Sequence, residues 1–356
     1  MSHSKLQTND DPLEIQTIDP LVGESWDAIV IAHKDHTVFH RSAWARVLAE
    51  TYGHRPHYLE ISIGGRHVAL IPVMEVASWI TGRRGVSLPF SDFAGPLWTD
   101  RQTKPRVYKA LLDLAAKRNW RHLEIRGDCT LPNEIKYFRT YESHQLDLRS
   151  GVEIIARNLE ASVRRAIRKA ERSGIQTIAD HSISAVDTFY ELHGRTRRRH
   201  GLPPQPVSFF RAIADNLIAK GLGTVILATL GGTPVAGAIF LYSGNRAIYK
   251  FGASDTEHWP SRPNHAVMWK AIRTLIEIGC TELQFGRTAS NDQGLLRFKR
   301  SWGAQSKPVS YLRHDCRTEV WQSEGHHPVE SHPLIFGKLP ISLNRIAGRL
   351  IYPHLD

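Results

Sequence analysis

An internal repeat constrains the fold of this chain more than any other feature. The stretch I-G-G-R-H-V-A at 63–69 matches the stretch L-G-G-T-P-V-A at 230–236, and in both copies apolar runs enter and leave the Gly-Gly pair. Glycine tolerates the positive φ angles that two-residue hairpin turns need. Each copy is therefore predicted to form a β-hairpin, and the chain is predicted to contain the same α/β unit twice.

Each predicted hairpin is followed by a similar helix and strand. Helical apolar spacing over 107–120 gives way to a strand pattern after Asn119, and the spacing over 267–280 does so after Gly279. The two hairpins are 167 residues apart and the two helices 160, a nearly constant offset. Because the matching hairpin segments are short, chance similarity is the alternative explanation.

The repeat predicts an α/β (α+β) fold with two tandem units, each a mixed twisted sheet flanked by helices. The predicted division is a disordered N-terminus at 1–14, a first unit at 15–150, a second unit with the active site at 151–316, and a linker with an amphipathic C-terminal helix at 317–356. We expect that helix, over Leu339–Tyr352, either to pack on the first unit or to lie on a membrane surface.

Charge and cysteine content limit the partners and the compartment. The 356 residues carry a formal net charge of +11, which favours anionic partners such as nucleic acid, nucleotide sugars, coenzyme A or anionic lipid. Three cysteines at unrelated spacings argue for a reducing compartment and against a disulfide framework or a zinc site. The sequence contains no apolar signal core or spanning segment, so we expect a cytoplasmic protein, with peripheral contact at the inner membrane face left open.

A basic helix is predicted at 160–174. One apolar stripe must pack on protein and consists of Val163, Ala166, Ile167 and Ala170. The other face is a candidate anion-binding surface and carries Arg164, Arg165, Arg168 and Lys169. A basic outward face is as often simply solvated, and the sequence leaves both interpretations open.

Two further segments supply candidate site residues. The run R-T-R-R-R-H-G-L-P-P-Q-P at 195–206 is predicted to be a proline-stiffened loop whose arginine forks suit phosphate or carboxylate oxygens. Its substrate-binding candidates are Arg197, Arg198 and Arg199. The run S-L-P-F-S-D-F-A-G-P-L-W at 87–98 carries one carboxylate, Asp92, which either caps a turn or orients a substrate amine.

A strand and a short helix are predicted near the end of the second unit. The strand L-Q-F-G-R-T ends near Arg287, and the helix places Phe298 and Trp302 on one face. Lys299 lies beside that face, where a lysine ordinarily snorkels to solvent. No glycine-rich phosphate loop occurs at 252–265. We predict no metal site, because partners at metal-ligand spacing are missing for the tail histidines His326, His327 and His332.

Taken together, these motifs resemble the FemAB-like (BioF2-like) branch of the GNAT acyltransferase superfamily. The resemblance lies in the order of a hairpin, Y-K-F-G-A-S, P-N-H-x-x-x-W, L-Q-F-G-R and F-K-R-S-W-G, preceded by S-L-P-F-S-D-F-A-G-P-L, R-R-A-I-R-K-A and R-R-R-H-G-L-P-P-Q-P. It covers roughly residues 15–315. Members of this branch contain two GNAT-like units in tandem, which agrees with the repeat found from the residues alone.

The resemblance implies transfer of an acyl or aminoacyl group to an amine in peptidoglycan or exopolysaccharide assembly. It places the lysine of the F-K motif, Lys299, near the reacting carbonyl, and the arginine of the R-x-G motif, Arg199, on the anionic precursor. It implies no tightly bound cofactor, with aminoacyl-tRNA or acyl-CoA as the donor. Gln284 stands where members often carry Asp, which puts the role of that Asp in doubt, and the coiled-coil insertion of some members is missing.

The needs of acyl transfer suggest a mechanism. The amine must be neutral and positioned, the carbonyl polarised and the leaving group accommodated. The resemblance to a GNAT-like unit implies that the strands around 249–252 and 283–286 splay and that a backbone amide there binds the carbonyl oxygen. We expect Lys299 to stabilise the developing charge and Asp92 to orient the amine. The remaining substrate-binding candidates are Tyr249, Arg287 and Phe298.

Two rival functions remain open at this point. One is a coenzyme-A-dependent GNAT N-acetyltransferase acting on a small amine or amino sugar, and the other is a non-enzymatic basic binding protein. The expected partners are an anionic small-molecule or lipid-linked envelope precursor and, as donor, a tRNA, with no DNA. The sequence leaves open the oligomeric state and the identities of donor and acceptor.

Overall fold

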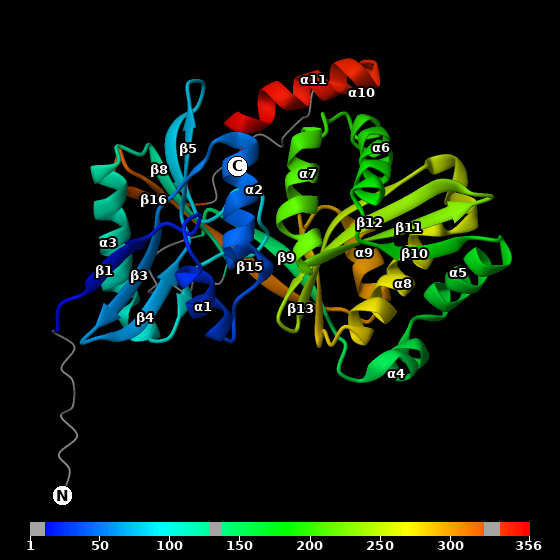
Figure 1. Cartoon of the computed structure of the whole chain (residues 1–356), viewed down its shortest axis with the longest axis horizontal. Helices are drawn as coiled ribbons and strands as arrows, with labels where there is room; N and C mark the ends of the chain where they lie inside the picture. The colour runs from blue at the N-terminus through cyan, green and yellow to red at the C-terminus, as the bar shows by residue number, and fades with distance from the viewer. Residues whose placement is uncertain (1–10, 128–136, 324–334) are drawn as a thin grey trace, which may run out of the picture.

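The fold is built around one large mixed sheet (Figure 1). The computed structural model describes residues 11–127, 137–323 and 335–356. In this described part, the large sheet has the strand order β10-β11-β12-β13-β14-β9-β15-β8-β6-β5-β2, and β16 pairs with β15. A smaller sheet has the order β1-β3-β4-β7.

Strands and helices alternate along much of the chain. The strands are β1 (Glu14–Ile18), β2 (Arg55–Pro56), β3 (Tyr58–Ile63), β4 (Arg66–Ile71), β5 (Met74–Ser78), β6 (Gly82–Val86), β7 (Leu97–Trp98), β8 (His122–Arg126), β9 (Arg139–Asp147), β10 (Gln176–Asp180), β11 (Gly223–Leu230), β12 (Thr233–Ser243), β13 (Arg246–Ser254), β14 (Glu282–Thr288), β15 (Gln305–Asp315) and β16 (Val320–Gln322). The α-helices are α1 (Ser25–Ala32), α2 (Ser42–Tyr52), α3 (Lys104–Lys117), α4 (Gly151–Asn158), α5 (Ala161–Arg172), α6 (Ile183–Arg199), α7 (Val207–Asn216), α8 (Pro263–Glu277), α9 (Gln293–Ser301), α10 (Ile335–Lys338) and α11 (Ile341–Ile351).

Both predicted hairpins are present. Two-residue turns join β3 to β4 and β11 to β12, and positive φ angles occur at all four glycines of these turns, Gly64, Gly65, Gly231 and Gly232. Both hairpins also have a register shift shortly before the turn, at 61–62 and at 228–229. The predicted helix stops, Asn119 and Gly279, adopt φ angles of 54° and 88°. Local turn chemistry therefore explains these boundaries.

Strands from the two predicted units share the large sheet. β9 comes before the predicted boundary at 150, yet it lies between β14 and β15, and β15 pairs in turn with β8. The division between 150 and 151 is therefore not a break in the sheet. It stays a prediction about units of the sequence.

Two ends of the predicted division need correction. Glu14 pairs with Ser62 in the small sheet, so it belongs to β1 and not to a disordered tail. Residues 320–322 pair with 313–315 as β16, so this part of the predicted linker is a strand. Residues 1–10 of the predicted disordered N-terminus lie outside the described residues.

Helices cover both faces of the β11–β13 region. Along β12, Ile239 and Leu241 join a core with α2, α6 and α7, whereas Ala238 and Phe240 join a core with α5 and α8. This alternation follows from the period-two geometry of a strand. The apolar stripe predicted for the basic helix is buried on α5, as expected. The sheet thus separates two faces, each with its own set of helices (Figure 1).

The arginine-rich run at 195–206 was expected to be a loop, and this expectation is wrong for its first part. α6 continues to Arg199, so residues 195–199 are helical. Gly201, with a φ of 68°, follows the end of the helix, and the irregular proline segment begins after it. Pro203, Pro204 and Pro206 therefore keep only the residues after Gly201 out of a helix, whereas the predicted loop extended back to residue 195.

The segment 335–356 packs across both halves of the fold. α11 lies on α6, where Asn344 Nδ2 donates to the Leu202 carbonyl at 3.1 Å and Arg197 Nη2 donates to Tyr352 Oη at 2.8 Å. Farther along the segment, the Asp356 carboxylate accepts hydrogen bonds from two arginines of the first half, Arg84 and Arg126. The expectation that the C-terminal helix packs on the first unit is therefore wrong for α11, which packs on α6 of the second unit; only the residues that follow it reach the first half.

Asp356→Asn is expected to destabilise the protein by about 3 kcal/mol, because it removes the carboxylate that pairs with the buried Arg84 and leaves Arg126 with Glu124 as its counter-charge. Burial opposes ionisation of Asp356, but the two arginines hold the pKa of its carboxyl below the ordinary value. Its contribution is therefore present above the ordinary carboxyl pKa of about 4 and is lost as the pH falls below it. Urea denaturation across this range measures both effects. The exposed pair of Asp147 with Arg149 gives a control, since Asp147→Asn should change little. Equal losses in the two variants would contradict the assignment.

Candidate active site

The candidate site begins where two strands of the large sheet separate. β13 and β14 pair in parallel only over 246–248 and 282–284. Beyond these residues, β13 skips Lys250 in its register with β12, and β14 shifts register against β9 between Gln284 and Arg287. Gly286, with a φ of 69°, permits the second irregularity. The splay expected between these strands is confirmed.

A buried ion pair lines one side of the gap. Lys250 Nζ lies 2.8 Å from Asp92 Oδ2 and faces the rings of Phe39 and Phe251. Burial alone would raise the pKa of the Asp92 carboxyl, but the positive charges of Lys250 and Arg287 lower it overall, so Asp92 is ionised. Sequence reasoning missed Lys250 as a site residue. The register irregularity around it has no sequence signal, and only the motif Y-K-F-G-A-S included it.

Arg287 links the ion pair to two tyrosines. Its guanidinium carbon lies 4.8 Å from the ring centroid of Tyr141 and 5.2 Å from that of Tyr311. Arg287 Nη1 donates to Tyr311 Oη at 2.7 Å, and Tyr311 Oη donates to the Asp92 carbonyl at 3.2 Å. Arg287 Nε is 3.8 Å from Asp92 Oδ1. The predicted arginine thus lies in the centre, held by tyrosines that the sequence did not single out.

Lys299 reaches the gap from α9. Its buried Nζ donates to the Gly286 carbonyl at 2.9 Å and to Thr288 Oγ1 at 2.5 Å. Burial lowers the pKa of Lys299 to about 8, and the negative charge of Asp92 opposes this shift. The alternative of a snorkelling lysine is therefore wrong, because α9 directs the side chain inward to the carbonyl groups at the end of β14.

Gly286 is the point at which these groups meet. A Cβ built on it would lie 3.7 Å from Asp92 Cγ and 3.6 Å from the Tyr249 carbonyl oxygen, while its own carbonyl accepts the Lys299 hydrogen bond. The Tyr249 hydroxyl lies over Gly252, where a Cβ would clash with it at 1.7 Å. The predicted site residues that the fold brings together here are Asp92, Tyr249, Arg287 and Lys299.

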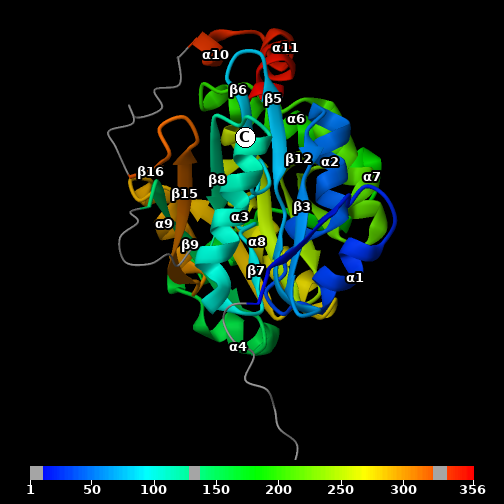
Figure 2. The same ribbon diagram turned by 90° about the vertical axis from the view of Figure 1, so that its left-hand side faces the viewer.

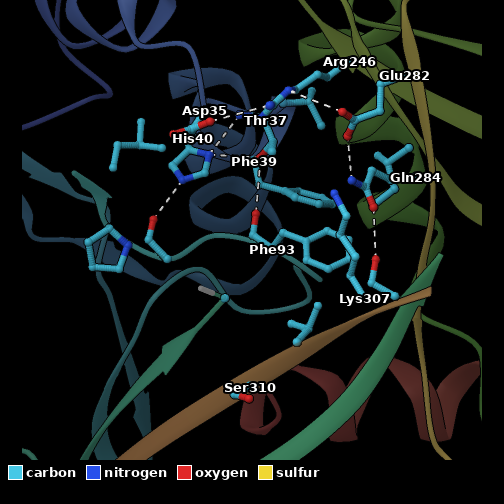
Figure 3. A pocket seen from close by; sticks show the side chains of 18 of the residues that line it. Asp35, Thr37, Phe39, His40, Phe93, Arg246, Glu282, Gln284, Lys307 and Ser310 are labelled. Atoms are coloured by element: carbon cyan, nitrogen blue, oxygen red, sulfur yellow. Dashed lines mark hydrogen bonds and ion pairs between the residues drawn. The ribbon is translucent and has the colours of Figure 1, made fainter. Parts of the chain in front are cut away.

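Figure 3 shows a cavity, of about 590 Å³, whose walls include neighbours of the ion pair. Phe39, which contacts Lys250, and Phe93, which follows Asp92 in the chain, both line it. The cavity also receives polar groups from β13, β14 and β15, together with residues of the loop before α2. It therefore combines aromatic walls with charged side chains, which is typical of a small-molecule site.

The polar groups of the cavity hold one another in place. Arg246 lies 3.6 Å from Asp35 and 3.9 Å from Glu282, and Gln284 Nε2 donates to Glu282 Oε1 at 2.6 Å. Ser143 Oγ donates to Gln284 Oε1 at 3.0 Å. Gln284, which departs from the family pattern, is thus a lining residue fixed by two hydrogen bonds (Figure 3). Burial lowers the pKa of His40, another lining residue, to about 4, so that imidazole is neutral.

A second pocket, of about 490 Å³, lies between α5, α8 and α9. The cationic side chains that line it are Arg165, Lys169, Arg262 and Arg297. Phe298 lines it as well and packs edge-on against Trp302. The pocket includes the first turn of α8, where backbone amides and the helix dipole favour an anion.

The predicted anion-binding face of α5 is only partly assembled around this pocket. Arg165 and Lys169 line it, whereas Arg168 is exposed and does not. Arg164 Nη1 instead donates to the carbonyls of Arg157 and Leu159 at 2.9 and 2.5 Å, which joins α5 to the end of α4. One half of the face thus surrounds a pocket, and the other half is solvated or structural.

The arginines at the end of α6 do not meet at the gap. Arg197 donates to the Pro203 carbonyl at 3.2 Å and to Tyr352, and Arg198 donates to the Gly337 carbonyl at 3.4 Å. Arg199 donates to the Ser254 carbonyl at 3.2 Å and stacks on Trp259. Arg197 and Arg198 therefore hold the segment 335–356, and Arg199 holds the end of β13.

Residues 11–127, 137–323 and 335–356 contain no group of three or more side chains that could hold a metal ion. Within the same ranges, no helix has the length and apolar character of a membrane span. The tail histidines named above, at 326, 327 and 332, lie outside the described residues.

Comparison with known proteins finds one matching domain family and several relatives. Residues 157–300 match the acetyltransferase (GNAT) domain. Lipid II:glycine glycyltransferase of Staphylococcus epidermidis is 33% identical over 78 residues, which are 20% of this chain and 19% of that protein. The Staphylococcus saprophyticus protein of the same name is 32% identical over 102 residues, 25% of each chain. The chain thus spans a fifth to a quarter of the curated relatives that it matches.

Solved structures resemble the chain over most of its length. FemX superposes with a TM-score of 0.65 at 16% identity, over 83% of this chain and 96% of that one. A tandem GNAT protein from the clavulanic acid biosynthesis pathway gives 0.55 at 12% identity, over 86% and 99%. L-PGS from Bacillus licheniformis gives 0.55 at 13%, over 89% and 96%. At such identities the likeness concerns the fold, and it confirms the expected tandem GNAT-like architecture.

Lys250→Met and Asp92→Asn are each expected to destabilise the protein by about 3 kcal/mol, because each leaves a buried charge without its nearest partner. The double variant should cost clearly less than the sum, with a coupling of about 1 kcal/mol or more between the two residues. Urea denaturation of the four proteins measures this coupling. The same cycle on the exposed pair of Arg211 and Asp187 should give almost none. Additive effects at Lys250 and Asp92 would contradict a direct ion pair.

Proposed function

We propose that the chain, whose residues 157–300 match the acetyltransferase (GNAT) domain, is a FemAB-like transferase that moves an acyl or aminoacyl group to an amine in cell-envelope biosynthesis. The observation that carries the proposal is the gap between β13 and β14. Lys299 and Asp92, which belong to elements on opposite faces of the sheet, approach Gly286 there. A donor and an acceptor that enter from the two faces can meet only where the strand ladder has ended.

The donor occupies the face with the cationic pocket. Arg165, Lys169, Arg262 and Arg297 surround a space beside the first turn of α8, which suits the phosphates of a tRNA acceptor end or of coenzyme A. Phe298 offers a ring for stacking on a base or an acyl chain. Both donors are activated acyl carriers that need no tightly bound cofactor.

The acceptor occupies the aromatic and polar cavity on the other face. Arg246 and Lys307 provide positive charge for a phosphate or carboxylate, and Phe39 and Phe93 provide apolar walls close to Asp92. The name of the curated relatives, lipid II:glycine glycyltransferase, supports a lipid-linked envelope precursor as the acceptor. Such an acceptor agrees with the expectation of a cytoplasmic protein in peripheral contact with the inner membrane face.

The reaction joins the acceptor nitrogen to the donor carbonyl carbon. A neutral amine attacks the ester or thioester, a C–N bond forms, and the C–O or C–S bond breaks. The amine proton leaves with the departing tRNA hydroxyl or coenzyme A thiol. Ionised Asp92 accepts a hydrogen bond from the amine and orients it. Lys299 Nζ donates to the Gly286 carbonyl, to Thr288 Oγ1 and, over the longest distance of 3.5 Å, to the Arg287 carbonyl; in the reaction the developing oxyanion replaces this last acceptor.

Lys299→Met is expected to lower kcat about a hundredfold or more, because it removes a positive charge from the oxyanion. Since the pKa of Lys299 is lowered to about 8, wild-type activity should fall as the pH rises above that value. Lys299→Arg should keep part of the activity and lose this alkaline limb, because arginine does not deprotonate there. The test is kcat against pH, with circular dichroism to confirm folding. Full activity of Lys299→Met would remove the lysine from the mechanism.

Product formation tests the function itself. Labelled aminoacyl-tRNA or acetyl-CoA is offered together with lipid II or its soluble nucleotide precursor, and the product is identified by mass spectrometry. We expect an N-acylated product with one of the two donors. Binding of nucleic acid without any product would instead indicate a basic binding protein.

A matched pair of α5 variants tests the donor side. Arg165→Ala/Lys169→Ala removes two cations that line the pocket, and it should raise the donor KM about tenfold. Arg168→Ala/Arg172→Ala removes two exposed cations of the same helix that do not line it, and the donor KM should stay nearly unchanged. The same increase in both variants would indicate general charge attraction and would contradict a defined donor pocket.

A further inference from the structure

One end of the molecule exposes an unusual set of large apolar side chains. Trp79 and Ile80, at the turn between β5 and β6, are 87% and 57% exposed. Beside this hairpin, α11 exposes Leu343, Ile346 and Leu350, with Leu350 at 66%. Figures 1 and 2 both show the β5–β6 hairpin and α11 at the same end of the molecule. We call these five side chains the tip surface.

A surface helix ordinarily buries its apolar face. In α11 the large aliphatic side chains at 343, 346 and 350 face outward instead. Its buried face carries Asn344, Gly348 and the adjoining Tyr352. Asn344 donates to the Leu202 carbonyl, and a Cβ on Gly348 would lie 1.9 Å from the Pro204 carbonyl oxygen, so this face packs closely. The apolar residues at 343, 346 and 350 follow helical spacing and lie on the outside. Within residues 11–127, 137–323 and 335–356, the outward stripe stays about half or more exposed and is not covered by apolar side chains.

The hairpin and the helix are held together as one surface. Ser78 Oγ and His354 Nδ1 are 3.0 Å apart, and Arg84 Nη2 donates to the His354 carbonyl at 2.9 Å. The ring of Trp79 meets that of His354 edge-on, with centroids 5.7 Å apart. The two exposed apolar groups therefore keep a fixed position relative to each other, as a docking surface requires.

Exposed cations lie on both parts of the tip surface, while the acids beside α11, Asp187 and Glu191, lie on α6, where Glu191 pairs with Arg345. Lys338 and Arg349 are exposed on α10 and α11, and Arg83 is exposed on β6, next to the hairpin turn. Residues 335–351 contain three basic residues and no acidic one. This combination of exposed apolar and basic side chains suits the interface of a bilayer that contains anionic lipid. Tryptophan and aliphatic side chains enter the headgroup region, and Lys and Arg bind the anionic headgroups.

We propose that the tip surface docks the protein on a membrane that contains anionic lipid, with Trp79, Ile80 and the outer stripe of α11 entering the headgroup region. This inference goes beyond the proposed transfer, because docking requires neither donor nor acceptor. It gives the segment 335–356 two faces with separate roles. The inner face fastens the segment to α6 and to the first half, and the outer face binds lipid.

Vesicle co-sedimentation tests the proposal, with phosphatidylcholine vesicles prepared with and without phosphatidylglycerol. We expect the wild-type protein to bind the anionic vesicles about tenfold more tightly than the neutral ones, and high salt to weaken this binding. Trp79→Ser/Ile80→Ser and Leu343→Ser/Ile346→Ser/Leu350→Ser should each lower the affinity about tenfold or more. All five side chains are exposed, so the melting temperatures should stay close to that of the wild type.

The control is Ile154→Ser/Ile178→Ser, which removes two exposed isoleucines on α4 and β10, away from the tip surface. Its vesicle binding should equal that of the wild type. The proposal is overturned if the wild type does not bind anionic vesicles, or if the control loses as much affinity as the tip variants. It is also overturned if sedimentation shows a dimer that the tip variants dissociate, because the surface then joins two copies of the chain.

Discussion

The early end of the β13–β14 ladder is the constraint on which the site depends. After three paired residues the strands separate, and charged side chains occupy the rim of the gap. The positive charges of Lys250, Arg287 and Lys299 all lower the pKa of one carboxylate, Asp92. Because buried charges cost free energy unless they are balanced, this excess of positive charge suits a partner whose negative charge is full or develops during reaction. In the proposed reaction, donor and acceptor meet at this gap from the cationic pocket and from the aromatic cavity.

Features set by local chemistry could be predicted from the sequence. The Gly-Gly hairpins, the helix stops at Asn119 and Gly279, and the buried stripe of α5 follow from φ preferences and apolar spacing. Features set by distant contacts could not. The bulge at Lys250, the inward turn of Lys299 and the cavity around Gln284 arise where strands and loops far apart in the chain meet. The pairing of β9 with β14 and β15, across the predicted boundary, was missed for the same reason, since the sequence of one strand does not identify its partners.

The arginines of α6 illustrate how a motif can persist while its contacts differ. The resemblance suggested that Arg199 contacts an anionic precursor, yet its guanidinium donates to the end of β13 and stacks on Trp259. Arg197 and Arg198 donate to groups of the segment 335–356 or of the loop that it covers. That segment also brings Asp356 to the first half of the chain. Positive charge proposed for substrate thus lies instead in the cationic pocket and in the cavity.

A crystal structure with a stable, amide-linked analogue of an aminoacyl-adenosine tests the central claim most directly. The account predicts that the adenosine lies toward α5, α8 and α9 and that the acyl carbonyl reaches the gap between β13 and β14. The carbonyl oxygen should then lie within hydrogen-bonding distance of Lys299 Nζ, at about 3 Å. An analogue bound elsewhere, with β13 and β14 untouched, would contradict the claim that this gap is where donor and acceptor meet.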